Sequence, residues 1–182
     1  MLNRRLFTRL LAGAAGASAA LAVTGKAAAR PLQTQADWMW CNKCGVLFYA
    51  AHEARSVCPA GGRHAHSTGA MVYSLLQDVS GYEQSGWQWC SKCQGLYFGP
   101  GREYGACPAG GLHGGEPSSN YTVLHGSTQG VNTGGATIQP DWKWCVRCQG
   151  LFYAMDQAAD RCARGGRHDG RKSGRYFMAS VR

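Results

Sequence analysis

The sequence lacks the short motifs that mark several common enzyme classes. It has no glycine-rich phosphate-binding loop, no serine nucleophile elbow and no His-Glu-x-x-His metalloprotease motif. It also lacks any segment with a convincing helical period of apolar residues. What remains is a chain rich in glycine and aromatic residues, which indicates a globular, loop-rich protein of the all-β class.

Cysteine is present in an odd number, nine, so complete disulfide pairing is excluded. All nine fall in three copies of one motif: Trp-x-Trp-Cys-x-x-Cys, an aromatic run, a third Cys and a His. The copies run from Trp38 to His64, from Trp87 to His113 and from Trp142 to His168. In each copy thirteen residues separate the second Cys from the third, and five separate the third Cys from the His.

Three thiols and one imidazole per copy make a closed tetrahedral ligand set for structural zinc. The sequence therefore predicts three Zn²⁺ ions. The predicted ligands are Cys41, Cys44, Cys58 and His64 for the first ion, Cys90, Cys93, Cys107 and His113 for the second, and Cys145, Cys148, Cys162 and His168 for the third. The alternatives are buried cysteines with incidental histidines, or a mixed set of disulfides. His66 is a second candidate for the first imidazole ligand.

Each copy predicts short strands joined by turns. The alternation in Trp-x-Trp-Cys is typical of a half-buried strand, and the aromatic run after the first cysteine pair predicts the returning strand of a hairpin. A Gly-Gly turn follows the third Cys, where positive φ would let the backbone wrap the ion. We expect one Trp of each pair in the core, and exposed aromatic rings, if any, at Tyr49, Phe98 and Tyr153.

Two all-β architectures fit these repeats. Either three zinc-ribbon-like modules fold separately and are joined by flexible linkers, like beads on a string, or the repeats close around a pseudo-threefold axis, as in a β-trefoil. A unit of about 40 residues rarely buries enough apolar surface to fold unaided, and the total length suits a shared core, so closure is favoured. The predicted divisions are an export signal over residues 1–29 and zinc repeats over 30–86, 87–140 and 141–182.

The N-terminal segment resembles a twin-arginine export signal. Asn3-Arg4-Arg5-Leu6-Phe7 leads into a weakly apolar run from Leu10 to Val23, and Ala27-Ala28-Ala29 supplies the small residues of a cleavage site. The run is too short and too rich in Gly and Ala to favour a membrane-spanning helix. Asn3 stands where that signal family has Ser or Thr, so ordinary secretion or a retained anchor stay open as alternatives.

Export would place the mature chain, from Arg30 onward, in the periplasm or outside the cell. The twin-arginine resemblance implies export in the folded state, so zinc could be bound before the thiols meet an oxidising compartment. Cleavage of the signal removes four basic residues and lowers the formal charge of the chain from +9 to +5. A divalent ion with three thiolates has a net charge of −1, so three such sites lower the charge of the chain to about +2. Nucleic acid is therefore an unlikely partner, although the basic residues gather after Asp141.

The whole motif resembles a repeat of exported bacterial proteins that has no established activity. That resemblance covers most of the mature chain in three copies. We expect a non-enzymatic binding module, monomeric and without a transmembrane span, whose partner is an envelope polysaccharide or a surface protein. The alternatives are an exported enzyme with a site in one repeat only, at His52, Glu53, Glu103 or His125, and nucleic-acid binding through the basic stretch from Arg161 to Arg175.

Overall fold

The computed structural model describes residues 33–78, 84–114, 116–126 and 135–181. Every described residue lies in one compact unit, Pro31–Arg182. The residues of the predicted export signal lie outside the described part. The described strands are β1 (Thr34–Trp40), β2 (Leu47–Tyr49), β3 (Val72–Gln77), β4 (Gln84–Trp89), β5 (Leu96–Phe98), β6 (Tyr121–His125), β7 (Thr137–Trp144), β8 (Leu151–Tyr153) and β9 (Tyr176–Val181).

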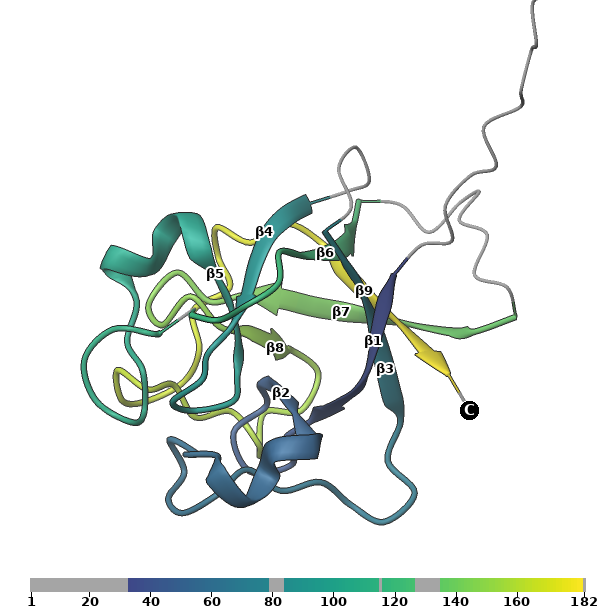
Figure 1. The fold of residues 1–182 in the computed structure, drawn as a ribbon. Coiled ribbons are helices and arrows are strands. Elements are labelled where there is room, and N and C mark those ends of the chain that lie inside the picture. The colour runs from purple at the N-terminus through teal and green to yellow at the C-terminus, as the bar shows by residue number, and fades with distance from the viewer. Residues whose placement is uncertain (1–32, 79–83, 115, 127–134, 182) are drawn as a thin grey trace, which may run out of the picture. The chain divides into compact units, whose positions relative to one another are not determined.

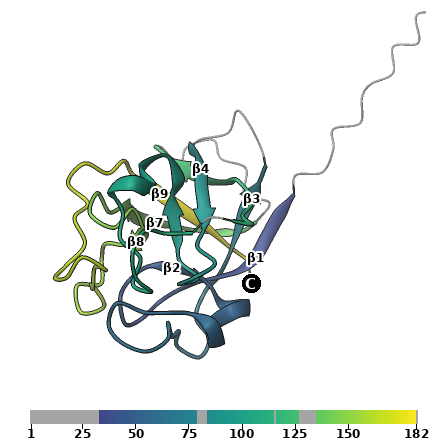
Figure 2. The same cartoon turned by 60° about the vertical axis from the view of Figure 1, so that its left-hand side comes forward.

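Each repeat contributes three strands in the same order. A long strand pairs with a short returning strand, and then with the last strand of the same repeat, as in β1–β2 and β1–β3. In the first hairpin Trp38 lies opposite Tyr49 and Trp40 opposite Leu47. Two short 3₁₀ helices, η1 (Ala50–Arg55) and η2 (Gly99–Tyr104), follow the returning strands of the first two repeats. Figure 2 shows both on the outside of the strands.

A backbone irregularity precedes the first Trp of every repeat. Asp37, Gly86 and Asp141 occupy this position with φ of 65°, 93° and 68°. At each of them the register between the long strand and the last strand of its repeat shifts. A β-bulge of this kind bends and twists the strand, and the residue after it is the fully buried Trp38, Trp87 or Trp142.

The last strands of the three repeats close the sheet. Antiparallel pairs join β3 to β6, β6 to β9 and β3 to β9, so each strand contacts both of the others. Figure 1 shows these strands on one side of the molecule, with β2, β5 and β8 on the other. There the bridges Val46–Phe152, Phe48–Gly95 and Tyr97–Gly150 join the short strands in a second ring. The closed pseudo-threefold arrangement is therefore confirmed, and the arrangement as separate beads is wrong.

The shared core is built from one Trp of each repeat and one Tyr of its neighbour. Trp38, Trp87 and Trp142 are fully buried, as predicted for one member of each pair. Each meets the edge of a tyrosine from another repeat at a ring-centroid distance of 5.2 to 5.4 Å. The pairs are Trp38–Tyr121, Trp87–Tyr176 and Trp142–Tyr73. Such edge-to-face pairs are worth about 0.5–1.5 kcal/mol beyond the burial of area.

The aromatic residues expected at the surface are instead packed inside. Tyr49, Phe98 and Tyr153 are half-buried against the core. Each also contacts the second Trp of the next repeat, in the pairs Tyr49–Trp89, Phe98–Trp144 and Tyr153–Trp40, at 6.1 to 6.4 Å between centroids. The expectation of exposure is wrong because a single hairpin leaves these rings free, whereas closure brings a neighbouring repeat against them.

Hydrogen bonds between side chains run around the core in the same cyclic manner. The hydroxyl of each core tyrosine donates to a glutamine of another repeat, in the pairs Tyr121–Gln35, Tyr176–Gln84 and Tyr73–Gln139. Each glutamine stands three residues before the first Trp of its copy. These buried hydroxyls are thereby satisfied, which a closed aromatic core requires.

The first copy departs from the other two at one position beside its second cysteine. Gln94 and Gln149 each accept a hydrogen bond of 3.0 Å from an indole N–H, of Trp89 and Trp144 respectively. Gly45 takes this position in the first copy, with φ of 84°, and a Cβ there would lie 2.6 Å from the Ala159 carbonyl oxygen. The loop of the third repeat passes so close to Gly45 that only glycine fits.

Gly45→Gln is therefore expected to destabilise the protein, although both other copies carry glutamine. The added side chain must displace the backbone at Ala159, and overpacking of this kind costs about 1–3 kcal/mol. Thermal unfolding measures the loss. Gly69→Gln is the matched control, because Gly69 also has positive φ, 75°, but has no atom near its Cβ position. Equal melting temperatures for the two variants would contradict this account of Gly45.

Candidate metal centres

The structure brings the twelve predicted ligands together in three groups of four. The groups are Cys41, Cys44, Cys58 and His64; Cys90, Cys93, Cys107 and His113; and Cys145, Cys148, Cys162 and His168. Within each group the ligand atoms all lie within 4.8 Å of one another, and every ligand is buried except His168, which is half-buried. All nine cysteines are free thiols.

The spacing of the ligand atoms fits a tetrahedral ion. In the first group the Sγ atoms of Cys41 and Cys58 are 3.9 Å apart, and Cys44 Sγ is 3.4 Å from Nδ1 of His64. The same distances are 3.8 and 3.6 Å in the second group, and 3.9 and 3.4 Å in the third. Zinc bonds of about 2.3 Å to sulfur and 2.0–2.1 Å to nitrogen give tetrahedral edges of roughly 3.8 and 3.6 Å. The three Cys₃His clusters could therefore hold metal ions, and they are compatible with zinc.

Two tight turns present the cysteines of each cluster. The first pair follows the long strand, where the Gly45 amide donates to the Cys41 carbonyl at 2.8 Å. The third cysteine opens the Gly-Gly turn, where the amide of Cys58 donates to the carbonyl of Gly62 at 2.8 Å. Gly61 and Gly62 have φ of 95° and 65°, and the other two copies repeat these values closely. The predicted positive φ is confirmed in all three turns.

A cation joins the two turns in every copy, and the sequence reasoning missed it. Lys43, Lys92 and Arg147 stand directly before the second cysteine and donate to carbonyls of the Gly-Gly turn. Lys43 Nζ contacts the carbonyls of Gly61 at 2.5 Å and Arg63 at 2.9 Å. The signal was present, since all three copies have a basic residue there. The cation lies beside a site whose three thiolates would outweigh the charge of a divalent ion.

Lys43→Met is expected to weaken metal binding at the first cluster about 10–100-fold, as for other groups that support the ligands of a metal. The two turns lose their cross-link, and the turn carbonyls lose their donor. Competition with a chelator measures the affinity. Lys143→Met removes an exposed lysine from β7 as the control. If both variants hold metal as tightly as the parent chain, the role assigned to Lys43 is wrong.

The ligand histidines also connect one cluster to the next. Binding of a metal through Nδ1 leaves Nε2 protonated and free to donate. His113 Nε2 lies 3.0 Å from the Cys148 carbonyl oxygen, and His168 Nε2 lies 3.1 Å from the Cys44 carbonyl oxygen. The same atom of His64 is buried without a hydrogen-bond partner. Two of the three clusters therefore support the cysteine backbone of their neighbour.

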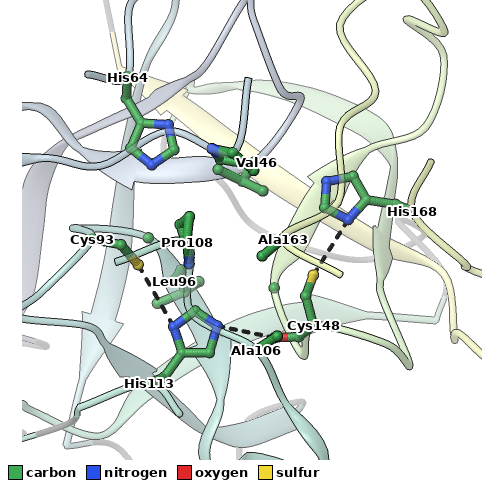
Figure 3. Close-up of a pocket in the computed structure, with 13 residues that line it drawn as sticks. Val46, His64, Cys93, Leu96, Ala106, Pro108, His113, Cys148, Ala163 and His168 are labelled. Carbon is green, nitrogen blue, oxygen red and sulfur yellow. Dashed lines mark hydrogen bonds between the residues drawn. The ribbon is translucent and has the colours of Figure 1, made fainter. Parts of the chain in front are cut away.

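The three histidine rings surround a small pocket where the repeats meet (Figure 3). The space open to the centre of a water molecule is about 20 Å³. Its walls are otherwise mainly apolar and include Val46, Leu96, Pro108 and Ala163. The pocket is too small for an organic substrate, since ligand sites usually measure about 300–1,000 Å³.

In every cluster the pKa of the first cysteine is lowered, and in the second and third clusters the pKa of the histidine is raised. Hydrogen bonds from Cys44 and Cys58 lower the pKa of the Cys41 thiol, and the equivalent bonds lower those of Cys90 and Cys145. Burial lowers the pKa of His113, but the thiols around it outweigh burial and raise that pKa to about 9. One thiolate in each cluster is thus favoured over its thiol, and thiolate is the form that binds a metal.

The alternative ligand His66 is placed outside the first cluster. Its Nε2 atom pairs with the carboxylate of Glu53 at 3.3 Å, and both side chains are partly exposed. His64 supplies the imidazole of that cluster instead. The two residues form a surface pair next to the site.

The unrepeated candidates for a catalytic site lie in different surroundings. His52 packs against Tyr49 and Trp89 in the aromatic layer. His125, at the end of β6, packs against Tyr176 at 5.0 Å, and Glu103 lies exposed in η2. His52 is half-buried, and its buried Nδ1 atom has no hydrogen-bond partner, whereas His125 is exposed.

Comparison with protein-family models, with curated proteins and with solved structures finds no match to this chain. In the part of the chain that the structure describes, no helix has the length and apolar character to span a membrane.

Proposed function

We propose that the mature chain is an exported, non-enzymatic structural-zinc protein that acts as a binding module for an envelope polysaccharide or a surface protein. Zinc is the metal that suits three thiolates and one imidazole in a tetrahedron. The three ions would staple the turns of a small closed sheet, and the outer faces of the repeats would meet the partner.

The observation that carries this proposal is the completeness of each ligand set. Four protein atoms fill the tetrahedron in every copy, and eleven of the twelve ligand residues are buried. A catalytic zinc ion keeps one position open for water or substrate. Sites of this kind therefore support a structural role for the metal and argue against hydrolysis at it.

The repetition of the fold supports a repetitive partner. Three related surfaces on one rigid scaffold can engage neighbouring units of a polymer, and the resulting avidity exceeds the affinity of any single contact. The small net charge, about +2 with three ions bound, makes nucleic acid the less suitable polymer because its binding depends on many phosphate contacts.

Sedimentation with isolated envelope fragments tests the proposal. The zinc-bound mature chain is expected to sediment with the fragments at physiological salt, and the fragments are expected to release no soluble products, as judged by mass spectrometry. A chain that stays in the supernatant would overturn the binding module. Release of products that stops in a folded His125→Ala or Glu53→Gln variant would replace it with the enzyme.

The export part of the proposal predicts that Arg4→Lys with Arg5→Lys traps the precursor in the cytoplasm. The pair of arginines is the recognised feature of the twin-arginine signal that residues 1–29 resemble, and lysine retains only the charge. Fractionation followed by immunoblotting measures the distribution. Arg9→Lys, which lies after the pair, is the control. Normal export of the double variant would indicate the general secretory route or another signal.

A further inference from the structure

The third copy differs from the other two in its Gly-Gly turn. From the third cysteine onward, the first two copies have the sequence Cys-Pro-Ala-Gly-Gly, whereas the third copy has Cys-Ala-Arg-Gly-Gly. Arg164 stands where the others have Ala60 and Ala109. The turn itself has the same backbone in all three copies, since the φ values of its glycines agree. The fold therefore does not require the arginine.

Arg164 belongs to a cluster of three arginines that hydrogen bonds to backbone carbonyls join to one another. Its Nε donates to the Arg147 carbonyl at 2.8 Å, and Arg147 donates in return to the carbonyls of Arg164 at 3.0 Å and Arg167 at 3.1 Å. Arg164 and Arg167 are exposed, and Arg147 is half-buried. Within the described residues the ion pairs are His66–Glu53 and Arg171–Asp169, so no carboxylate neutralises this cluster.

The backbone of an exposed tyrosine contacts the cluster. Nη2 of Arg164 donates to the carbonyls of Tyr104 at 2.9 Å and Gly105 at 3.0 Å, which fixes the end of η2 against the turn. The side chain of Tyr104 is 68% exposed, and it is the one exposed aromatic residue in the described part of the chain. Every other large aromatic side chain there is at least partly buried. Its exposure is thus an exception to the packing of this fold.

We propose that Tyr104, Arg147, Arg164 and Arg167 form a subsite for an acidic polysaccharide. The guanidinium groups bind the carboxylate of a sugar, and the ring of Tyr104 packs against the face of that sugar. This inference rests on the proposed function, for which it names the partner class and the surface.

The chemistry of the four residues fits this partner. A guanidinium has five N–H donors in a planar fork that matches a carboxylate. Carbonyl contacts hold Arg147 and Arg164 in place, and a hydrogen bond of 3.0 Å from Arg167 Nη1 to Gln157 Oε1 holds Arg167. Other donors stay free, so less side-chain entropy is lost on binding. The acids nearest in sequence are Asp169, which pairs with Arg171 at 2.7 Å, Asp160, whose Oδ1 atom accepts from the His168 amide at 2.8 Å, and the exposed Glu103.

A single aromatic ring and three cations suit one or two sugar units better than a strand of nucleic acid. Proteins that bind single strands combine a basic groove along the backbone with several stacking rings. Here the second ring is missing, because Tyr49, Phe98 and Tyr153 are packed against the core. An acidic sugar polymer is therefore the favoured occupant.

The repeats supply variants for the test that the fold accommodates. Arg164→Ala with Arg167→Leu gives the third turn the residues of the second copy, Ala109 and Leu112. Arg63→Leu is the matched control, because it makes the same change to leucine at the equivalent position of the first copy, away from Tyr104. Tyr104→Ala removes the ring. Circular dichroism and the zinc content establish that each variant is folded.

Titration of the zinc-bound mature chain with polygalacturonate measures the affinity, with dextran as the neutral polymer and oligothymidylate as the nucleic acid. We expect the chain to bind polygalacturonate and not to bind dextran. The double variant should weaken binding about tenfold or more, the effect of losing one hydrogen bond to a charged group. Tyr104→Ala should also weaken binding, because the ring no longer packs against the sugar. Arg63→Leu should bind as the parent chain does.

Three results would overturn the subsite: no binding of polygalacturonate, an equal loss in Arg63→Leu, or tighter binding of oligothymidylate that the same variants abolish. Sedimentation with envelope separates this failure from that of the proposed function. A chain that sediments with envelope but does not bind polygalacturonate loses only the subsite. A chain that binds polygalacturonate through these residues but ignores envelope loses only the envelope partner.

Discussion

Withdrawal of zinc by a strong chelator is expected to unfold the entire closed sheet in one transition. A structural zinc site in a small domain contributes on the order of 10–16 kcal/mol to folding, whereas a whole domain is stable by only about 5–15 kcal/mol. Three such sites are proposed for this sheet, and without metal no ion joins the two turns of each cluster. Far-ultraviolet circular dichroism and the dispersion of the indole N–H signals in NMR spectra measure the transition.

Addition of zinc after chelation should restore both signals, and addition of magnesium should not, because Mg²⁺ prefers oxygen ligands. This pair of additions controls for irreversible damage by the chelator. A chain that keeps its dispersed indole signals after its metal content has fallen to zero would show that the core is sufficient without the ions.

Cys93→Ser is expected to unfold all three repeats, although it removes a ligand from the second cluster only. The Cys93 carbonyl accepts a hydrogen bond from the Val57 amide of the first repeat at 3.4 Å, and β6 pairs with both β3 and β9. Loss of the second ion therefore removes support from both neighbours. The expected loss is of the order of the zinc contribution itself, about 10 kcal/mol or more.

The six tryptophans report this spread, since each repeat contains two. In Cys93→Ser the indole signals of Trp38 and Trp142 should collapse together with that of Trp87. Leu112→Ser changes an exposed residue, 45% accessible, in the same cluster's turn and should leave all six signals in place. Retention of the first and third repeats' signals in Cys93→Ser would mean that the repeats fold independently.

The sequence was sufficient for the hairpin and the ligand set of each repeat. The alternation of Trp-x-Trp-Cys and the aromatic run identified the two strands of each hairpin, which the register of Trp38 with Tyr49 shows. The spacing of Cys58 and His64 from the first cysteine pair grouped each ligand set, because short turns bring these residues together with few alternatives. Closure was favoured from the length and the number of aromatics, and the cyclic pairing of β3, β6 and β9 confirms it.

Contacts between repeats could not be derived in the same way. The burial of Tyr49 depends on Trp89, forty residues along the chain, and the sequence alone does not show which repeat follows which around the axis. Two repeated signals were nevertheless available: a glutamine three residues before each first Trp, and a basic residue before each second cysteine. Both turned out to make hydrogen bonds that join separate segments.

Departures from the repeat have their own physical causes. Gly45 replaces glutamine because the Ala159 carbonyl occupies the space of a side chain. Arg164 replaces alanine and joins the third repeat to the second through the Tyr104 carbonyl. The first departure is a requirement of packing, whereas the second adds a charge at the surface beside the backbone of the exposed Tyr104.

Measurement of the metal content and of the thiols of the purified mature chain tests the central claim most directly. Elemental analysis combined with native mass spectrometry should find three zinc ions per chain. Thiol titration after denaturation in the presence of a chelator should find all nine cysteines reduced. Substantially fewer than three ions, together with disulfide bonds, would contradict the account.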